Sequence, residues 1–252
     1  VGSEMCIRDR KRLVGSTEFI NNKKRWCLWL VGISPSELRK MPMVLQRVEA
    51  CKEDREKSPD AGRRKLAETP TLFREINNPV SFILVPKVSS EKRRYVPMGF
   101  LDNNTISTDL NFIIPEATMY HFAILTSNIH MAWMRAVCGR MKSDYRYSAN
   151  IVYNNFPWPT PTEEQKQKIE QTAQAILDAR ALYPDSSLAD LYDELTMPPE
   201  LRKAHHQNDI AVMQAYGFTK GSEAYKSETA CVAELMKRYE HLCTQQQNTK
   251  EQ

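Results

Sequence analysis

The sequence contains few glycines, and none is spaced for a loop that binds nucleotides. Eight glycines occur among 252 residues, at positions 2, 15, 32, 62, 99, 139, 217 and 221. A loop that cradles phosphates needs a Gly-x-Gly pair or a Gly-Lys-Ser/Thr sequence, because backbone N–H groups must approach the phosphates closely. Neither pattern is present, so we expect no nucleoside cofactor to bind to this chain.

Other signatures are missing as well. No apolar stretch reaches the length of about 18 residues that a membrane-spanning helix needs, and residues 1–10 lack the apolar segment of a secretory signal. The metalloprotease motif His-Glu-x-x-His and the hydrolase motif Gly-x-Ser-x-Gly are absent. Six cysteines, at positions 6, 27, 51, 138, 231 and 243, form no Cys-x-x-Cys pair, and no histidine lies at ligand spacing to them. We therefore expect reduced thiols, no zinc site and a cytoplasmic location.

The charge that is present is distributed unevenly along the chain. Residues 1–160 contain 25 Lys and Arg against 16 Asp and Glu, a net charge of +9. Residues 161–252 contain 10 against 15, a net charge of −5. A basic part joined to an acidic part favours a polyanionic partner for the basic part alone. Incidental surface charge is the alternative.

Apolar patterning predicts an α+β first part. Runs rich in Val, Ile, Phe, Tyr and Trp predict strands at 25–31, 80–88, 95–101 and 111–114, joined by polar turns into a small mixed or antiparallel sheet. Ser34, Pro35 and Glu37 have the spacing of a capping box and predict a helix, which Pro42 kinks or delays. A second helical period begins at Ala117, with a break at 126–128 and a stop near Gly139.

Prolines at 157, 159 and 161 predict a boundary, after which Thr162 caps the first of several helices. We expect a first, α+β domain over residues 12–156, with helices packed on the sheet. An all-α C-terminal domain over 157–244 and a disordered tail over 245–252 follow. Residues 1–11 have no periodicity that fits the rest, and we interpret them as a non-native segment.

Two short motifs invite a catalytic interpretation. The segment Asn154-Asn155-Phe156-Pro157-Trp158-Pro159 is like the Asn-Pro-Pro-Tyr signature of amino-group methyltransferases, but Phe156 replaces the first proline and no cofactor loop precedes it. We favour a packing hinge between the two parts. Glu53, Asp54 and Glu56 lie close together, but a solvated helix face explains them better than a metal site.

Basic residues form clusters, mostly in predicted turns before residue 150. Lys and Arg in turns can reach phosphates while the scaffold stays rigid. Four clusters beside an acidic part favour a surface that follows duplex DNA. The residues that we select as DNA-backbone contacts are Lys23, Lys24, Arg63, Arg64, Lys92, Arg93, Arg140 and Arg146.

The segment from Gly139 to Ser148 mixes donors, an acceptor and aromatic residues. In an extended segment, residues two apart face the same way, so Lys142 and Asp144 would share one surface. A lysine can donate to O6 and N7 of guanine, and an aspartate can accept from the amino group of cytosine. The pair could therefore read one G·C base pair. A local salt bridge within a loop is the alternative.

The longer motifs resemble the MmeI-like family of restriction–modification enzymes. The resemblance begins at Gly15-Ser16-Thr17-Glu18-Phe19 and covers nearly the whole chain after about residue 12. It is strongest over residues 125–135, 144–148 and 155–159. The helical end, with Asp190-Leu191-Tyr192-Asp193 and Ala215-Tyr216-Gly217, resembles the C-terminal domain of that family.

The resemblance implies a class I methyltransferase that uses S-adenosylmethionine to modify the adenine amino group in duplex DNA. It also implies that the positions matching Lys142 and Asp144 hold a charge pair that reads a base. The cofactor loop and catalytic tetrapeptide are absent, so we expect this chain to lack the methyltransferase domain and to methylate nothing by itself. Its expected partners are double-stranded DNA and that missing domain, with no membrane.

Two other interpretations stay open. The chain could be a protein–protein interaction or scaffold module whose basic turns are incidental, which a salt-dependent DNA affinity would distinguish. It could also bind single strands through Trp26, Trp29, Tyr145 and Tyr147, which requires those rings to be exposed. We expect Trp26 and Trp29 to lie in the core instead.

Overall fold

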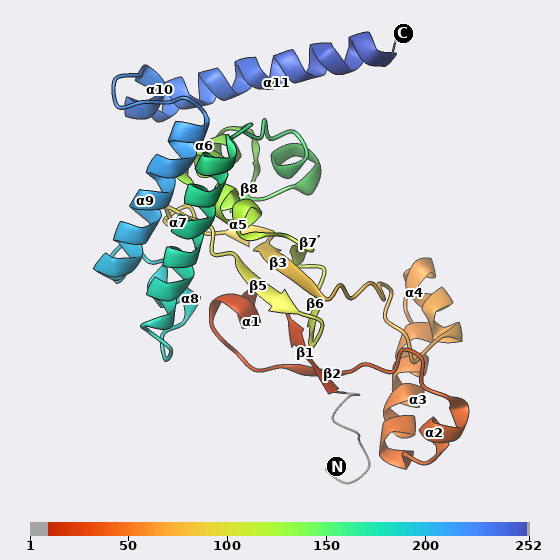
Figure 1. Ribbon diagram of the computed structural model, residues 1–252. Coiled ribbons are helices and arrows are strands. Elements are labelled where there is room, and N and C mark those ends of the chain that lie inside the picture. The colour runs from red at the N-terminus through yellow and green to blue at the C-terminus, as the bar shows by residue number, and fades with distance from the viewer. Residues whose placement is uncertain (1–9, 251–252) are drawn as a thin grey trace. The chain divides into compact units, whose positions relative to one another are not determined.

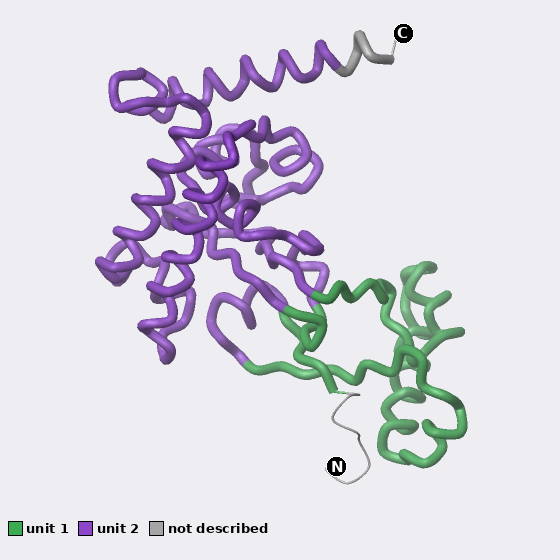
Figure 2. The backbone as a smooth tube through the Cα atoms, in the orientation of Figure 1, with its two compact units in different colours: residues 1–14, 24–80, 102–106 green, residues 15–23, 81–101, 107–252 purple. Residues whose placement is uncertain are grey.

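A computed structural model describes residues 10–250, and the chain forms two compact units (Figures 1 and 2). Unit 1 contains residues 10–14, 24–80 and 102–106 of the described chain, and unit 2 contains residues 15–23, 81–101 and 107–250. The predicted α+β class is confirmed, with small sheets and packed helices followed by a helical end. The predicted division at residue 156 does not coincide with these units, because the core of unit 2 takes side chains from both sides of it.

Unit 1 combines a short sheet with a helical cluster. Strand β1 lies between β2 and β6, and it pairs with β2 in antiparallel register. Arg10 and Lys11, which fell within the predicted non-native segment, are part of β1; residues 1–9 lie outside the described chain. The elements of this unit are β1 (Arg10–Val14), β2 (Trp26–Leu28), α2 (Pro35–Arg39), α3 (Pro42–Glu56), α4 (Ala61–Lys65), a 3₁₀ turn (Leu66–Glu68) and β6 (Thr105–Ser107, which crosses into unit 2).

Local sequence signals determine where the helices of unit 1 begin. Ser34 caps α2 with a capping box to Glu37, as predicted. Pro42 does not kink a longer helix but occupies the first turn of a new one, α3, where its missing N–H costs nothing. Leu30 packs with Val44 and neighbouring apolar residues of α3 into a small core of its own.

Unit 2 contains two further sheets. Strands β5, β3 and β7 form one sheet in that order, and β4, β9 and β8 form the other. The predicted strand at 80–88 is interrupted at Lys87, and the strand predicted at 95–101 begins only at Gly99. The strands of unit 2 are β3 (Ser81–Pro86), β4 (Val88–Ser89), β5 (Gly99–Asp102), β7 (Asn111–Pro115), β8 (Gly139–Met141) and β9 (Asp144–Arg146).

Helices cover these sheets and share one large apolar core with them. α7 packs against α5 and α9, and α11 packs against α6. The helices of unit 2 are α1 (Ser16–Ile20), α5 (Met119–Leu125), α6 (Asn128–Val137), α7 (Glu163–Ala181), α8 (Leu188–Leu191), α9 (Pro199–Ala215), α10 (Glu223–Lys226) and α11 (Glu228–Lys250), with a π-helical turn at Ala149–Tyr153.

Two predicted helix ends need correction. α6 does end before Gly139, but through an extended Cys138 rather than a left-handed glycine, so Gly139 begins a strand. α11 continues to Lys250, through most of the predicted disordered tail, because its run of glutamines consists of good helix formers. Within residues 10–250, no helix is both long and apolar enough to cross a membrane.

The aromatic–proline segment packs inside unit 2, as the hinge interpretation predicts. Phe156 is buried, with its ring edge against His130 at a centroid distance of 4.6 Å. The carbonyl oxygen of Pro157 accepts a hydrogen bond of 2.8 Å from the hydroxyl group of Tyr216. That oxygen is therefore occupied by the helical end of the chain, which disfavours a role in holding a base.

A buried carboxylate joins the helical end to the first part of the chain. Asp209 on α9 accepts 2.6 Å from the Tyr95 hydroxyl group and 2.7 Å from the backbone N–H of Asn128, at the start of α6. Burial raises the pKa of Asp209 to about 6, although both hydrogen bonds lower it. Tyr95 also stacks on His205 at 4.2 Å, and Tyr192 links His205 to Arg180.

We predict that Asp209 makes stability fall as pH rises through its native pKa. The unfolded carboxyl has a pKa near 3.9, so between about pH 4 and pH 6 the native state binds more protons and unfolding becomes easier with rising pH, by up to about 3 kcal/mol. Asp209→Asn keeps the shape and removes this titration. The free energy of unfolding of the wild type minus that of the variant, from urea titrations at several pH values, should therefore decline across this window.

This difference removes the contribution of the buried residues His130 and His205, which is the same in both proteins. Their lowered pKa values make stability rise with pH, in the opposite direction to Asp209. Asp209→Ala removes the same titration and also leaves the Asn128 N–H without an acceptor, so at every pH it should be less stable than Asp209→Asn, by about 1 to 3 kcal/mol. A difference between wild type and Asp209→Asn that stays flat from pH 4 to pH 6 would contradict the assignment.

Candidate nucleic-acid interface

The predicted base-reading residues lie on a β-hairpin. β8 and β9 pair in antiparallel register, with Met141 opposite Asp144 and Gly139 opposite Arg146. Lys142 and Ser143 form the two-residue loop between them. β4 pairs with the other edge of β9 and makes it the central strand of the sheet. The hairpin begins two residues after α6 ends, so its position depends on that helix.

The two faces of the hairpin differ in burial. Residues directly opposite each other in an antiparallel pair share a face. Tyr145, which is buried, therefore shares one face with its partner Arg140. Asp144 and Arg146 lie on the other face with Met141, whose side chain is 50% exposed. We call the face with Met141, Asp144 and Arg146, which is opposite to the buried Tyr145, the open face of the hairpin.

The sequence prediction of an extended backbone at Lys142 was wrong. Lys142 has φ = +57°, the left-handed region, because it occupies the first position of the hairpin loop. A positive φ at that position is typical of a type II′ turn, where glycine is the usual residue. Lysine in this conformation costs on the order of 1 kcal/mol. Lys142 and Asp144 are therefore neighbours across a turn and not along one strand.

Arg140 contacts both the loop of the hairpin and the ring of Tyr145. Its guanidinium Nη1 donates a 2.8 Å hydrogen bond to the carbonyl oxygen of Ser143, and its Cζ lies 4.1 Å from the ring centroid of Tyr145. An ion pair of 3.9 Å to Glu91 completes its contacts. Sequence reasoning selected Arg140 as a phosphate contact, which stays a prediction, but these contacts show a role in holding the loop.

The turn that follows β4 contacts the hairpin at Asp144. The backbone N–H of Glu91 donates to Oδ1 of Asp144 at 3.4 Å. Lys92 is exposed, and Arg93 is half-buried, where burial lowers its pKa against the opposing effect of Asp193 and Asp144. The structure thus brings Lys92, Arg93, Asp144 and the hairpin together, and their contacts with DNA stay a prediction.

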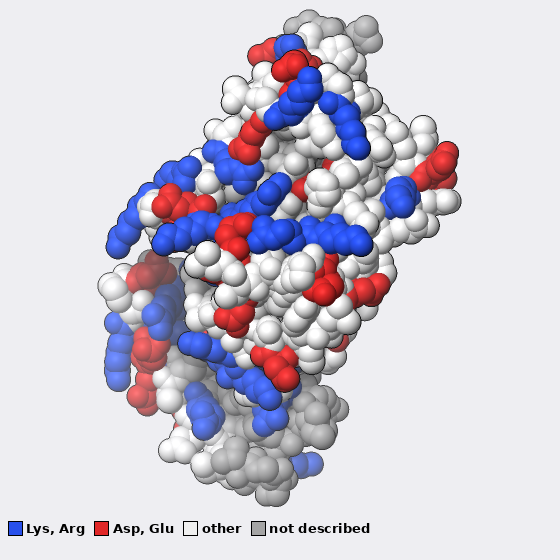
Figure 3. Space-filling view, turned by 90° about the vertical axis from the view of Figure 1, so that its left-hand side faces the viewer, with Lys and Arg blue, Asp and Glu red and all other residues white. Residues whose placement is uncertain are grey.

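A cavity of about 580 Å³ lies next to this turn, entirely within unit 2. Its wall carries both signs of charge, and Arg135 is neutralised there by two 2.8 Å hydrogen bonds to Glu228. Among the described residues, no ion pair within 4 Å involves Lys92, Arg93 or Arg94. These three cations line the cavity. On the face drawn in Figure 3, runs of Lys and Arg side chains are interspersed with Asp and Glu.

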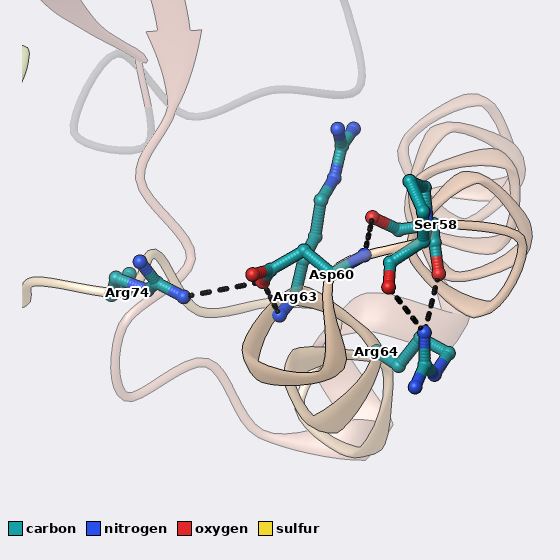
Figure 4. A network of polar contacts seen from close by, with 6 residues as sticks. Ser58, Asp60, Arg63, Arg64 and Arg74 are labelled. Carbon is teal, nitrogen blue, oxygen red and sulfur yellow. Dashed lines mark hydrogen bonds and ion pairs between the residues drawn. The ribbon is translucent and has the colours of Figure 1, made fainter.

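The other predicted contacts lie apart from the hairpin. Lys23 is an exposed residue of unit 2, and Lys24 is an exposed residue of unit 1. Arg63 and Arg64 belong to α4 in unit 1. Arg64 donates to the carbonyl oxygens of Ser58 and Pro59, both at 2.8 Å, and so stabilises the turn before its own helix (Figure 4).

Acidic residues of α3 pair with nearby cations, as a solvated face predicts. Arg63 forms an ion pair with Asp54, and Glu53 and Glu56 each pair with a lysine one turn away. Over residues 10–250, no group of three or more His, Cys, Asp or Glu side chains is placed to hold a metal ion.

The aromatic residues proposed for single-strand stacking are divided between core and surface. Tyr145 and Tyr147 are buried, so neither ring can stack on a base. Trp26 is 47% exposed, which contradicts the expectation that it belongs to the core. Trp26 begins β2, an edge strand of its sheet, and its ring is covered by the guanidinium of Arg10, 4.4 Å from the ring centroid.

Family models and a curated relative match nearly the whole chain. The family model described as the MmeI target recognition domain matches residues 7–160, and the model of the MmeI C-terminal domain matches residues 161–246. DNA methyltransferase A of Bacillus subtilis (strain 168) is 40% identical over 233 residues, which are 92% of this chain and 26% of that protein.

A solved structure is similar at the level of the fold. It is described as the Type IIL restriction–modification enzyme MmeI in complex with DNA, with 47% sequence identity and a TM-score of 0.89. The match covers 94% of this chain and 31% of that one. The chain thus spans about a quarter to a third of the length of the relatives that it matches.

We predict that the loop of the hairpin is strained at Lys142. Lys142→Gly should leave the free energy of unfolding unchanged or raise it by up to about 1 kcal/mol, since glycine adopts a positive φ without steric cost. Lys142→Val should lower it by about 1 kcal/mol or more, because a β-branched residue strongly disfavours that region. Thermal and urea unfolding measure both.

Met141→Val provides the matched control, because the same side chain is introduced one residue earlier in an exposed strand position. Its effect should stay within about 0.5 kcal/mol. Equal losses for valine at positions 141 and 142 would show that the backbone at Lys142 is not strained.

Proposed function

The chain belongs to the MmeI family, and on this premise we propose that it is the sequence-reading module for duplex DNA of an adenine-specific DNA methyltransferase. The observation that carries the proposal is the β8–β9 hairpin, with Lys142 in its loop and Asp144 beside it on the open face. Its relatives include a DNA methyltransferase and a restriction–modification enzyme solved with DNA, which supports the same conclusion.

The dimensions of a two-stranded hairpin suit the major groove. That groove is about 12 Å wide and admits a two-stranded β-ribbon, and each base pair presents a distinct pattern of donors and acceptors there. In our proposal Lys142 donates to guanine O6 and N7, and Asp144 accepts from the cytosine amino group of the same base pair. Burying either charge alone would be costly, so the pair reads G·C as a unit.

Strain in the loop supports this role. A non-glycine residue at positive φ persists where the surrounding structure over-determines it, and such residues cluster at functional sites. Arg140, which lies against the buried Tyr145, donates a hydrogen bond to the loop at Ser143, and this contact pre-organises Lys142 before DNA arrives. Lys92 and Arg93 beside the hairpin, together with Arg146 on its open face, then supply contacts to the phosphate backbone that fix the register.

The chemistry itself belongs in the remainder of the parent protein. We propose that a methyltransferase domain in the same polypeptide binds S-adenosylmethionine and receives the adenine, and that the whole enzyme acts in the cytoplasm. Within this chain no residue is assigned to methyl transfer. The module's contribution is to position that domain on one DNA sequence.

We predict that reversing the charge pair reverses one base preference. The double variant Lys142→Asp/Asp144→Lys, tested by selection from randomised duplexes, should exchange G·C for C·G at a single position and leave the others unchanged. Discrimination at that position should be worth about 1 to 3 kcal/mol, the ordinary range for a good base contact.

Lys92→Gln is the matched control, because it removes a phosphate contact but no base contact. It should weaken binding uniformly across sequences without moving any preference. A wild-type chain that is folded but does not bind DNA at low salt would overturn the proposal in favour of a scaffold role. A double variant that keeps the wild-type preference would remove Lys142 and Asp144 from base reading.

A further inference from the structure

A strip of positive charge lies on the sheet of unit 1, far in sequence from the hairpin. Strand β1 begins Arg10-Lys11-Arg12, and Lys24-Arg25-Trp26 leads into its partner β2. We call these six residues the basic ribbon. Neither it nor the rest of β1 and β2 contains an acidic residue. Five cations within two paired segments repel one another unless an anion lies between them.

One face of the basic ribbon combines two arginines with an exposed tryptophan. Arg12 pairs directly with Trp26, so Arg10, Arg12 and Trp26 share a face of the sheet. Cζ of Arg10 lies 4.4 Å from the ring centroid of Trp26. A guanidinium that stacks on an aromatic ring is held flat and keeps the N–H donors on its edge, which match a phosphate group in geometry.

Three cations of the basic ribbon form none of the ion pairs that the same unit contains elsewhere. On α3, Lys52 pairs with Glu56 at 3.8 Å and Lys57 pairs with Glu53 at 3.7 Å. Among the described residues, no such ion pair is formed by Arg10, Lys11 or Arg12. Unit 1 therefore contains paired charges on α3 and three cations on β1 that have no ion pair to a described residue.

Other contacts hold these cations in place without cancelling their charge. Nζ of Lys11 donates 2.7 Å to the carbonyl oxygen of Asn103 and lies 5.3 Å from the ring centroid of Trp29. Nε of Arg12 is buried and has no hydrogen-bond partner in the described chain. The side chains are thus partly ordered in advance, which lowers the entropy cost of binding an anion.

From these observations we infer that the basic ribbon is a second DNA-contact surface, which binds the phosphodiester backbone of the duplex without reading its sequence. The inference rests on the proposed function and extends it to residues of unit 1. A phosphate backbone fits because the ribbon offers a row of cations and edge donors but no acceptor side chain that could select a base. Trp26 serves to hold Arg10, not to stack on a base.

The test removes two charges from the ribbon of the 252-residue chain. Arg10→Gln/Arg12→Gln is compared with wild type by fluorescence anisotropy on a labelled duplex of mixed sequence across a salt series. Each lost phosphate contact reduces the slope of log K against log salt by about 0.9, so the slope should fall by about 2. Base preferences, measured by selection from randomised duplexes, should not change.

Lys52→Gln/Lys57→Gln is the matched control, because it removes the same charge from the same unit at positions already paired with acids. Its salt slope should equal that of wild type. Trp26→Leu keeps both arginines, and we expect it to weaken binding about threefold at an unchanged slope, as the loss of one cation–π contact implies. Circular dichroism melts verify that each variant is folded, and Arg10→Gln alone, at an exposed position, replaces the double variant if that one unfolds.

Three results would overturn the inference. One is a ribbon variant that is folded and keeps the wild-type slope. Another is a loss equal to that of the α3 control, which would indicate a general effect of net charge. The third is a ribbon variant that loses more affinity for a single strand of the same sequence than for the duplex. Failure of the proposed function is a different outcome, since the wild-type chain itself would then show no salt-dependent binding.

Discussion

The buried carboxylate of Asp209 is the contact on which the arrangement of unit 2 depends. It caps the first turn of α6 from a helix more than 80 positions further along the chain, and it also holds Tyr95. α6 leads almost directly into β8, so the contact that anchors α6 anchors the hairpin. An isolated hairpin of this size would be marginally stable in water. The acidic, helical end of the chain therefore stabilises the position of the hairpin in the basic part.

Rigidity and charge are divided between different residues in a way that suits DNA recognition. In the hairpin, Arg140 and Tyr145 contact each other on one face, while Asp144 and Arg146 lie on the other. In unit 1, acidic residues of α3 form ion pairs, whereas Arg10, Lys11 and Arg12 form none with the described residues. In the proposed function, specificity comes from a few fixed side chains, and affinity comes from cations that contact phosphates.

Local signals in the sequence were sufficient for part of the fold. The capping box at Ser34, the N-cap at Thr162 and the break at 126–128 were predicted where the structure has them, because the residues that cap a helix are its immediate neighbours. The α+β class and the family followed from patterning and from long motifs. The role of Lys142 and Asp144 in base reading stays a prediction, and the extended backbone expected at Lys142 was wrong.

What could not be predicted depends on contacts between distant residues. The sequence of β1 has no clear alternation of apolar and polar residues, and the segment becomes a strand by pairing with β2 and β6. The exposure of Trp26 depends on the same sheet. The division into two units separates neighbours such as Lys23 and Lys24. The positive φ of Lys142 likewise depends on the register between β8 and β9, which no single residue determines.

The central claim is that the β8–β9 hairpin reads a base pair from the major groove. It is tested most directly by solving the structure of this chain on the duplex that it selects from a random pool. The account predicts that the amine of Lys142 and the carboxylate of Asp144 both lie within hydrogen-bonding distance of one G·C pair. A complex in which the hairpin lies outside the groove, or in which these two side chains contact only phosphates, would contradict it.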